Sequence, residues 1–180
     1  MRKVNDNGLK LVMLFEGCKL QAYADPASPL GQQLLKQPGQ RCTDWQKLSG
    51  DPWTVGWGST GVDAFNLDAN GKPTKIGPNT VWTQEQADKR LRDDLDVFAK
   101  QVEPLIKVDI NDNQFAALVS FTYNVGISNL KKSTLLTLVN QKNFTAAADE
   151  FVKWNRAQGK VLNGLTKRRE TEKRLFLTPV

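Results

Sequence analysis

A short run of strand-forming residues and glycines, Trp53-Thr54-Val55-Gly56-Trp57-Gly58-Ser59-Thr60, differs in character from the helical patterns that dominate the rest of the chain. β-Branched and aromatic side chains favour strands, and glycine permits the tight turns that join them. On the N-terminal side of the run stand two carboxylates, Glu16 and Asp25, nine residues apart. The run therefore predicts a small sheet, with a pair of carboxylates upstream of it.

The chain contains no histidine. This excludes a Ser-His-Asp or Cys-His catalytic site and removes the commonest zinc ligand. No cysteine spacing typical of a metal site occurs, so we expect neither a metal nor a cofactor. If the chain is an enzyme, its proton transfers fall to carboxylates. Enzymes that hydrolyse glycosidic bonds typically use a pair of carboxyl groups placed on opposite sides of the bond.

Hydrophobic periodicity predicts the elements around the run. A first helix ends at Gly17, which leaves Glu16 at a helix C-terminus, where the helix dipole disfavours negative charge. Strands are predicted at 20–23 and 53–57, and Asn70-Gly71 predicts a hairpin turn. The capping box Thr83-Gln84-Glu85-Gln86 begins a long helix that reaches Pro104. Further helices are predicted at 112–123, 134–141, 146–154 and 165–176.

These elements predict an α+β fold in a single domain of 180 residues. We expect the first helix, 1–17, to pack on a mainly helical C-terminal lobe. Residues 18–82 would form a small β-containing lobe, with a Pro- and Gly-rich insertion at 26–51 that includes a short helix around 32–36. Residues 83–180 would supply a long helix joining the lobes and the helical lobe itself. A cleft between two such lobes would accept an extended polymer.

Charge is unevenly distributed. The net charge is +6, and residues 151–180 alone carry eight basic side chains against two acidic ones. The C-terminal helix is therefore predicted to suit a polyanion, or else to be a solvated helix face. No apolar run is long enough to cross a membrane, and the N-terminus lacks the apolar stretch of a signal peptide. We expect the protein to accumulate in the cytoplasm unless something else releases it.

Several segments of the chain, including those that contain Glu16, Asp25 and Thr54, match the motifs of one protein family. The matching segments are Phe15-Glu16-Gly17, Tyr23-Ala24-Asp25, Thr54-Val55-Gly56-Trp57-Gly58, Trp82-Thr83-Gln84-Glu85-Gln86-Ala87, 112–118 with Phe121, Asn124 and Gly126, Gly159-Lys160-Val161-Leu162 with Gly164-Leu165, and Arg168-Arg169. In this order they resemble phage-type lysozymes, the muramidase endolysins related to the lysozyme of the T-even coliphages. The sequence departs from that family where Pro26 to Asp51 intervene between the Asp and the Thr.

The resemblance implies a lysozyme-like fold and hydrolysis of the β-1,4 bond between N-acetylmuramic acid and N-acetylglucosamine in peptidoglycan. It implies a phage or prophage endolysin that lyses the host after release from the host cytoplasm to the periplasm or cell wall through a holin. Peptidoglycan is then the partner of a monomer, with the basic C-terminal helix touching the anionic envelope and no role for nucleic acid. Two rivals stay open, a lytic transglycosylase acting on the same bond and a non-enzymatic basic module binding the envelope or nucleic acid.

Each candidate residue has a functional and a structural interpretation. Glu16 would be the general acid, or a surface carboxylate at a helix end. Asp25 would activate the attacking water or stabilise the oxocarbenium-like centre, or simply start a turn before Pro26. Thr54 would orient that water, or be an ordinary strand residue.

The remaining candidates concern substrate binding and packing. Tyr123 and Asn124 would line the saccharide site or pack at a helix end, and one of Arg168 and Arg169 would pair with Glu16 or both would be surface charge. Trp53 and Trp57 would stack on sugars or fill the small lobe, whereas Trp82 is expected to fill it. Cys18 and Cys42 are either two free thiols or a disulfide formed outside the cytoplasm.

Overall fold

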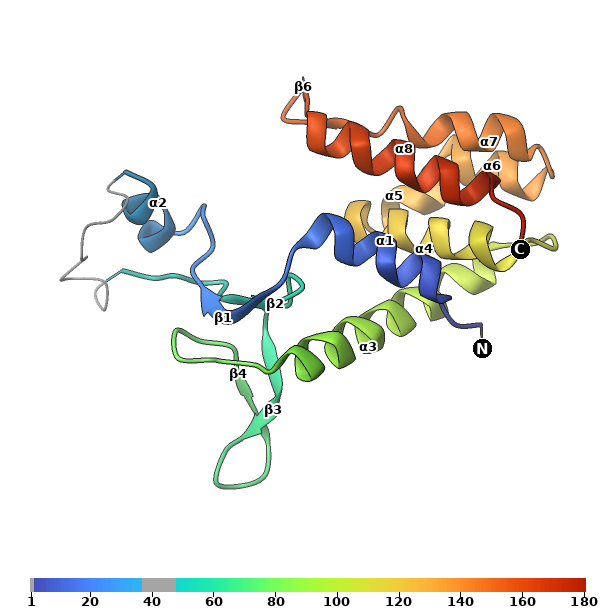
Figure 1. Cartoon of the computed structure of the whole chain (residues 1–180). Helices are drawn as coiled ribbons and strands as arrows, with labels where there is room; N and C mark the ends of the chain where they lie inside the picture. The colour runs from blue at the N-terminus through green and yellow to red at the C-terminus, as the bar shows by residue number, and fades with distance from the viewer. Residues whose placement is uncertain (1, 37–47) are drawn as a thin grey trace. The chain divides into compact units, whose positions relative to one another are not determined.

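The computed structural model describes residues 2–36 and 48–180 (Figure 1). The chain divides into two compact units. The helical unit combines Met1–Phe15 with Arg92–Val180, and the sheet unit is Glu16–Leu91. Within the described residues, no helix is long and apolar enough to cross a membrane.

The sheet unit is built on two small antiparallel pairs of strands. Its elements are β1 (Lys19–Tyr23), α2 (Pro29–Lys36), β2 (Thr54–Gly56), β3 (Val62–Leu67), β4 (Pro73–Lys75) and the start of α3 (Gln84–Val102). β1 pairs with β2, and β3 pairs with β4 across a turn in which Gly71 has a positive φ of 74°. The strands predicted at 20–23 and 53–57, the Asn70-Gly71 turn and the short helix within the insertion are confirmed.

Trp82 organises the core of the sheet unit. Its side chain is 2% exposed and packs with Ala22, Val55, Ile76 and Ala87. The indole Nε1 donates to Asp63 Oδ1 at 3.0 Å, which satisfies its buried polar atom. Trp82 therefore fills the unit, as expected. Trp53 and Trp57 are half-buried and pack against the same cluster.

The helical unit surrounds α4. Its elements are α1 (Asp6–Glu16, up to Phe15), the remainder of α3, the 3-10 turn η2 (Glu103–Leu105), α4 (Asp112–Val125), α5 (Ile127–Lys132), α6 (Thr134–Asn140), α7 (Phe144–Phe151), β5 (Arg156–Ala157), β6 (Lys160–Val161) and α8 (Asn163–Leu177). Ten residues of α4 are buried, and α8 packs against both α4 and α7 (Figure 1). α4 is thus the central helix of this unit.

α1 packs closely on α4 at a glycine. A Cβ at Gly8 would lie 2.6 Å from the Cβ of Ala116, so the two backbones approach more closely than a side chain would allow. At the start of both helices, the amide groups of Asn5 and Asn7 donate to Asn113 Oδ1 at 2.9 and 3.1 Å. These contacts hold the helix that ends in Glu16 against the core of the helical unit.

Candidate active site

Glu16 is positioned by the end of a helix and a glycine turn. It is the last residue of α1, and Gly17 follows with a positive φ of 66°, which stops the helix. The chain then enters β1 at Lys19, and Glu16 groups with the sheet unit. A Cβ built on Gly58, just after β2, would lie 3.5 Å from Glu16 Oε2. The glycine-rich run that opened the sequence therefore comes directly against this half-buried carboxyl group.

Asp25 lies between β1 and α2 and is held by backbone hydrogen bonds. Its Oδ1 accepts from the N–H of Ala27 at 2.6 Å, and its own N–H donates to the carbonyl of Gly50 at 3.0 Å. Asp25 therefore starts a turn, as its structural interpretation predicted. The second carboxylate oxygen, Oδ2, has no hydrogen bond to any residue that the structure describes. One oxygen thus fixes the half-buried carboxylate, and the other can take up a proton.

Thr54 is the first residue of β2 and stands opposite Tyr23 of β1 in the antiparallel register. Its hydroxyl is half-buried and lies 3.5 Å from the carbonyl oxygen of Pro52, a hydrogen bond at the upper limit of length. The pairing of two short strands thus places Thr54 beside a phenol.

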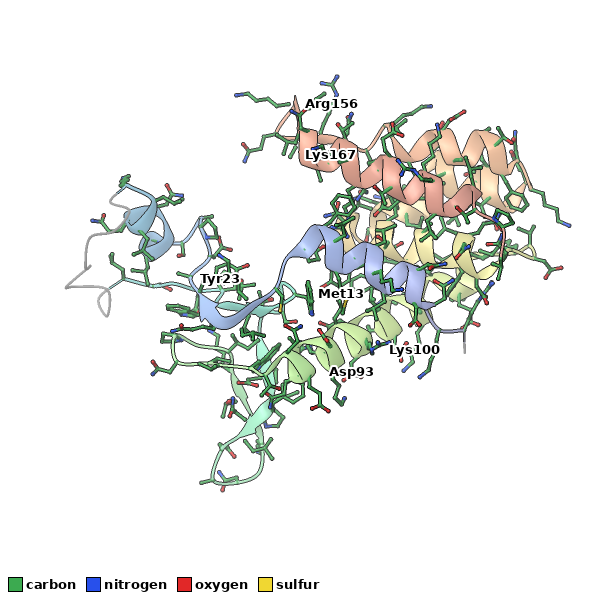
Figure 2. All side chains as sticks on the ribbon, viewed as in Figure 1. Met13, Tyr23, Asp93, Lys100, Arg156 and Lys167 are labelled. Atoms are coloured by element: carbon green, nitrogen blue, oxygen red, sulfur yellow. The ribbon has the colours of Figure 1, made fainter. Side chains whose placement is uncertain are left out.

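Tyr23 of β1 lies opposite Thr54 and two residues before Asp25 (Figure 2 labels Tyr23). Burial raises the pKa of its phenol, Thr54 lowers it, and the negative charges of Glu16 and Asp25 raise it. The sequence did not single Tyr23 out as a site residue, although it lies in the motif Tyr23-Ala24-Asp25. Its place opposite Thr54 depends on the strand register, which the insertion made unpredictable.

The other predicted site residues belong to the helical unit. Tyr123 is half-buried on α4, with its ring centroid 5.3 Å from that of Phe98 in an edge-to-face contact. Asn124 is exposed, and its Oδ1 accepts from Arg169 Nη2 at 2.9 Å. The expectation that Arg168 and Arg169 are surface charge is wrong, because their residues are only 4% and 0% exposed.

Arg168 and Arg169 are buried because α8 presents Glu172 between them. Arg168 Nε lies 3.2 Å from Glu172 Oε1, and Arg169 Nε lies 3.0 Å from Glu172 Oε2. Ser120 of α4 donates to the same carboxylate at 2.8 Å. Burial lowers the pKa of Arg169 to about 10, although the charge of Glu172 opposes this. Burial raises the pKa of Glu172, against the effect of the two guanidiniums.

The basic C-terminal segment divides into paired and unpaired charges. Lys153 pairs with Glu150, and Lys173 pairs with Asp149 at 2.7 Å. With the two buried arginines, which share Glu172, half of the eight basic residues are therefore paired. The exposed side chains of Arg156, Lys160, Lys167 and Arg174 form no ion pair with any described residue. Arg156 on the β5–β6 hairpin and Lys167 on α8 extend at the same end of the helical unit (Figure 2).

The two cysteines and metal binding complete the local chemistry. Cys18 is a half-buried free thiol whose pKa is raised by burial, and Gln84 Nε2 lies 3.8 Å from its sulfur. Cys42 lies outside the described residues, so a disulfide between the two stays a prediction. Among residues 2–36 and 48–180, no group of three or more metal-ligating side chains could hold a metal ion.

Comparison with known proteins assigns the family. The model of the phage lysozyme family matches residues 36–172. The chain belongs to the phage lysozyme family. The endolysin of Bacillus phage B103 is 40% identical over 175 residues, which cover 97% of this chain and 54% of that protein. The chain thus spans about half the length of this relative.

Solved structures of phage lysozyme relatives share the fold. A mutant of the P22 lysozyme superposes with a TM-score of 0.74 at 28% identity, covering 99% of this chain and 100% of that one. The muramidase domain of SpmX from Asticaccaulis excentricus superposes with a TM-score of 0.71 at 30% identity, with the same coverage of 99% and 100%. The predicted lysozyme-like α+β fold is confirmed. The family match includes Thr54 but begins after Glu16 and Asp25.

Proposed function

We propose that this phage lysozyme family member is an endolysin that hydrolyses the β-1,4 bond between N-acetylmuramic acid and N-acetylglucosamine in peptidoglycan. The proposal rests chiefly on one observation: the sheet unit holds Glu16, Asp25 and Thr54 together, with Gly58 of the glycine-rich run beside the Glu16 carboxyl group and Thr54 paired with β1 two residues before Asp25. The muramidase domain of SpmX and the B103 endolysin support the substrate and the biological role.

In the proposed reaction, Glu16 donates its proton to the glycosidic oxygen as the bond from that oxygen to the anomeric carbon breaks. A water molecule attacks the anomeric carbon from the opposite face. Asp25 takes one proton from that water through Oδ2, while Thr54 accepts a hydrogen bond from its other O–H. The products are two sugar ends, one of them a new reducing end. Asp25 then returns its proton to solvent, and Glu16 is reprotonated.

Substrate-binding roles for Tyr123 and Asn124 are part of the proposal. Asn124 is exposed and holds a guanidinium, which would fix its amide for a sugar hydroxyl. Arg168 and Arg169 are buried, so their proposed part is to support the substrate surface of α4 and α8 rather than to bind sugar directly. Pairing of one of them with Glu16, contact of the basic segment with the envelope, and release through a holin stay predictions.

The test compares wild type with Glu16→Gln on purified peptidoglycan. We expect the variant to fold normally and to lose activity by about 10²- to 10⁴-fold, because a neutral amide cannot donate the proton. New reducing ends and loss of turbidity are the measurements. Near-normal activity in the folded variant would remove Glu16 from the role of general acid.

Two further measurements on the products define the reaction. Mass spectrometry should find a hydrated reducing end, whereas an anhydro sugar would identify a lytic transglycosylase instead. NMR of the first-formed product should show inversion at the anomeric carbon, as is typical when water attacks opposite the leaving group. A product with retained configuration would contradict Asp25 as the base that activates water.

A further inference from the structure

We propose that Asp88 is a positioning residue, whose carboxylate holds two segments against α3: the turn that ends β2 and the residues that follow Glu16. The inference deepens the proposed hydrolysis and rests on it. Asp88 takes no part in bond cleavage, so its role is to fix the surroundings of the proposed general acid.

The chain turns tightly at the end of β2. Val55 and Ser59 exchange two backbone hydrogen bonds of 2.9 Å, which close the turn over the three residues between them. Gly56 and Gly58 have positive φ angles of 64° and 90°, a region that glycine adopts readily. A Cβ on Gly58 would lie 3.5 Å from Glu16 Oε2. A shift of this turn would therefore move the surface that borders the carboxyl group.

Trp57, the middle residue of the turn, is hydrogen-bonded to α3. Its indole Nε1 donates to Asp88 Oδ1 at 2.7 Å, and its side chain also packs against the core cluster of the sheet unit. Both residues are half-buried, and hydrogen bonds to an ionised carboxylate are stronger than those between neutral groups. The bond spans 31 positions of sequence, so it joins the turn to a separate element.

The same carboxylate oxygen is linked to the segment after Glu16. Gln84, one helical turn earlier on α3, donates from Nε2 to Asp88 Oδ1 at 2.7 Å, and this nitrogen lies 3.8 Å from Cys18 Sγ. An amide nitrogen carries two protons, so it can donate to both acceptors at once. Cys18 lies two residues after Glu16. One oxygen of Asp88 therefore accepts from both connections, to the turn and to the end of the first helix.

Loss of this oxygen should loosen the site without unfolding the unit. Gly56 rests on the core, because a Cβ there would lie 3.0 Å from Trp82 Cε3. The two backbone bonds between Val55 and Ser59 also remain. We therefore expect the turn to persist, while Trp57 and the backbone that follows it gain freedom to move.

The kinetic test compares Asp88→Ala with Asp88→Asn on purified peptidoglycan. Alanine removes the acceptor, so kcat should fall by roughly 10- to 100-fold with KM close to wild type, because a small displacement near reacting groups is costly. Asparagine keeps an oxygen that can accept from Trp57 and loses only the charge, so it should restore most of the wild-type kcat. Trp57→Phe removes the indole N–H, and combining it with Asp88→Ala should be no worse than the poorer single variant.

The control is Glu85→Ala, which removes an exposed carboxylate near the same end of α3 and should keep wild-type kcat. Equal losses in Asp88→Ala and Asp88→Asn would overturn the inference, because they would show that the charge matters rather than the hydrogen bond. A wild-type kcat in Asp88→Ala, or a loss that disappears when rates are expressed per folded molecule, would also overturn it.

An NMR test needs no activity. The chain has five tryptophans, and the indole N–H resonance of Trp57 is the one that Trp57→Phe removes. In Asp88→Ala this resonance and the backbone amide resonance of Gly58 should both shift, whereas in Asp88→Asn both should stay near their wild-type positions. A Gly58 amide that does not move when the indole resonance does would show that Asp88 does not position the turn. If wild type does not cleave peptidoglycan, the proposed function fails, whereas these shifts still report whether Asp88 holds the turn.

Discussion

Glu172 shows at the level of one residue why a basic sequence run need not be a basic surface. Its fully buried carboxylate lies between two guanidiniums, and Ser120 donates to it as well. The sequence allowed Arg168-Arg169 to be interpreted as surface charge, because arginine side chains are mostly exposed in proteins. The structure instead buries both side chains, and the guanidinium of Arg169 joins α8 to α4 by lying 5.0 Å from the ring centroid of Phe121 and donating to Asn124. A buried carboxylate that compensates two cations cannot be recognised from sequence.

We predict that Glu172→Gln strongly destabilises the protein. Removing the carboxylate leaves two buried guanidiniums without their shared anion, a change that typically costs about 3–5 kcal/mol. For a chain of this length the melting temperature should fall by roughly 6–20 °C. Lys153→Gln is the control, because it removes an exposed lysine that pairs with Glu150. A surface ion pair of this kind contributes at most about 1 kcal/mol. Equal melting temperatures for the two variants would show that the buried cluster contributes no more than a surface pair.

α2 shows at the level of one element what part of the insertion does. Ser28 precedes the helix, and its hydroxyl donates to the Asp25 carbonyl at 2.6 Å and accepts from the N–H of Gly31 at 3.0 Å. Gly31 is buried against Asp25: a Cβ there would lie 1.9 Å from the Asp25 carbonyl oxygen. The first turn of α2 is therefore packed onto the backbone that carries a proposed catalytic residue.

We predict that Gly31→Ala lowers activity more than stability explains. The new methyl group must displace either α2 or the turn at Asp25, at a typical cost of about 1–3 kcal/mol. Displacement of Asp25 should reduce kcat in the protein that remains folded. Gly164→Ala on α8 is the matched control, because a Cβ there meets nothing within 4 Å. If both alanine variants have the same kcat per folded molecule, the packing of α2 does not position Asp25.

Sequence predicted the elements that carry a clear periodicity, cap or turn signal and missed those that lack one. The first helix, the capped helix α3 and the β1–β2 strands follow from periodicity, from the Thr83–Gln86 capping box, and from Gly17. The helix α5 was missed because it has six residues and no side-chain cap. The β5–β6 hairpin was missed because its turn uses Gln158 and Gly159, both with positive φ, in place of the usual Asn-Gly or Asp-Gly.

The candidate site also contains residues that could be identified from sequence and one residue whose position could not. Glu16, Asp25 and Thr54 could be named from sequence because each lies in a motif next to a turn or strand. The position of Tyr23 opposite Thr54 could not be predicted, because the two strands are separated by the insertion. Local patterns predict what a residue can do chemically, whereas a neighbour distant in sequence requires the register.

For the whole molecule, the net charge of the sequence overstates the positive charge that is exposed to a polyanion. The net charge of +6 comes from the C-terminal segment, yet half of its basic residues are paired or buried. The unpaired charge of this segment is therefore concentrated on Arg156, Lys160, Lys167 and Arg174, which are exposed. The proposed attraction to an anionic polymer would depend on these side chains and would weaken as salt shortens the Debye length.

We predict that activity on intact peptidoglycan falls as ionic strength rises past about 0.1 M, where the Debye length is ~10 Å. Replacing Arg156, Lys160 and Lys167 together with glutamine should flatten this dependence. The control is Lys173→Gln, because Lys173 is already paired with Asp149; it should keep the wild-type salt profile. If the triple variant also keeps that profile, the exposed charges have no part in wall binding.

Glu16, Asp25 and Thr54 all belong to the unit Glu16–Leu91. Their mutual distances are therefore inherited from one short stretch of chain and its two small strand pairs. If these residues catalyse the proposed reaction, we expect natural variation in the helical unit to change thermal tolerance and the proposed substrate surface at Tyr123 and Asn124 more than it changes the spacing of the three. An engineer could exploit the same division by combining residues 16–91, kept unchanged, with helical units of other phage lysozymes.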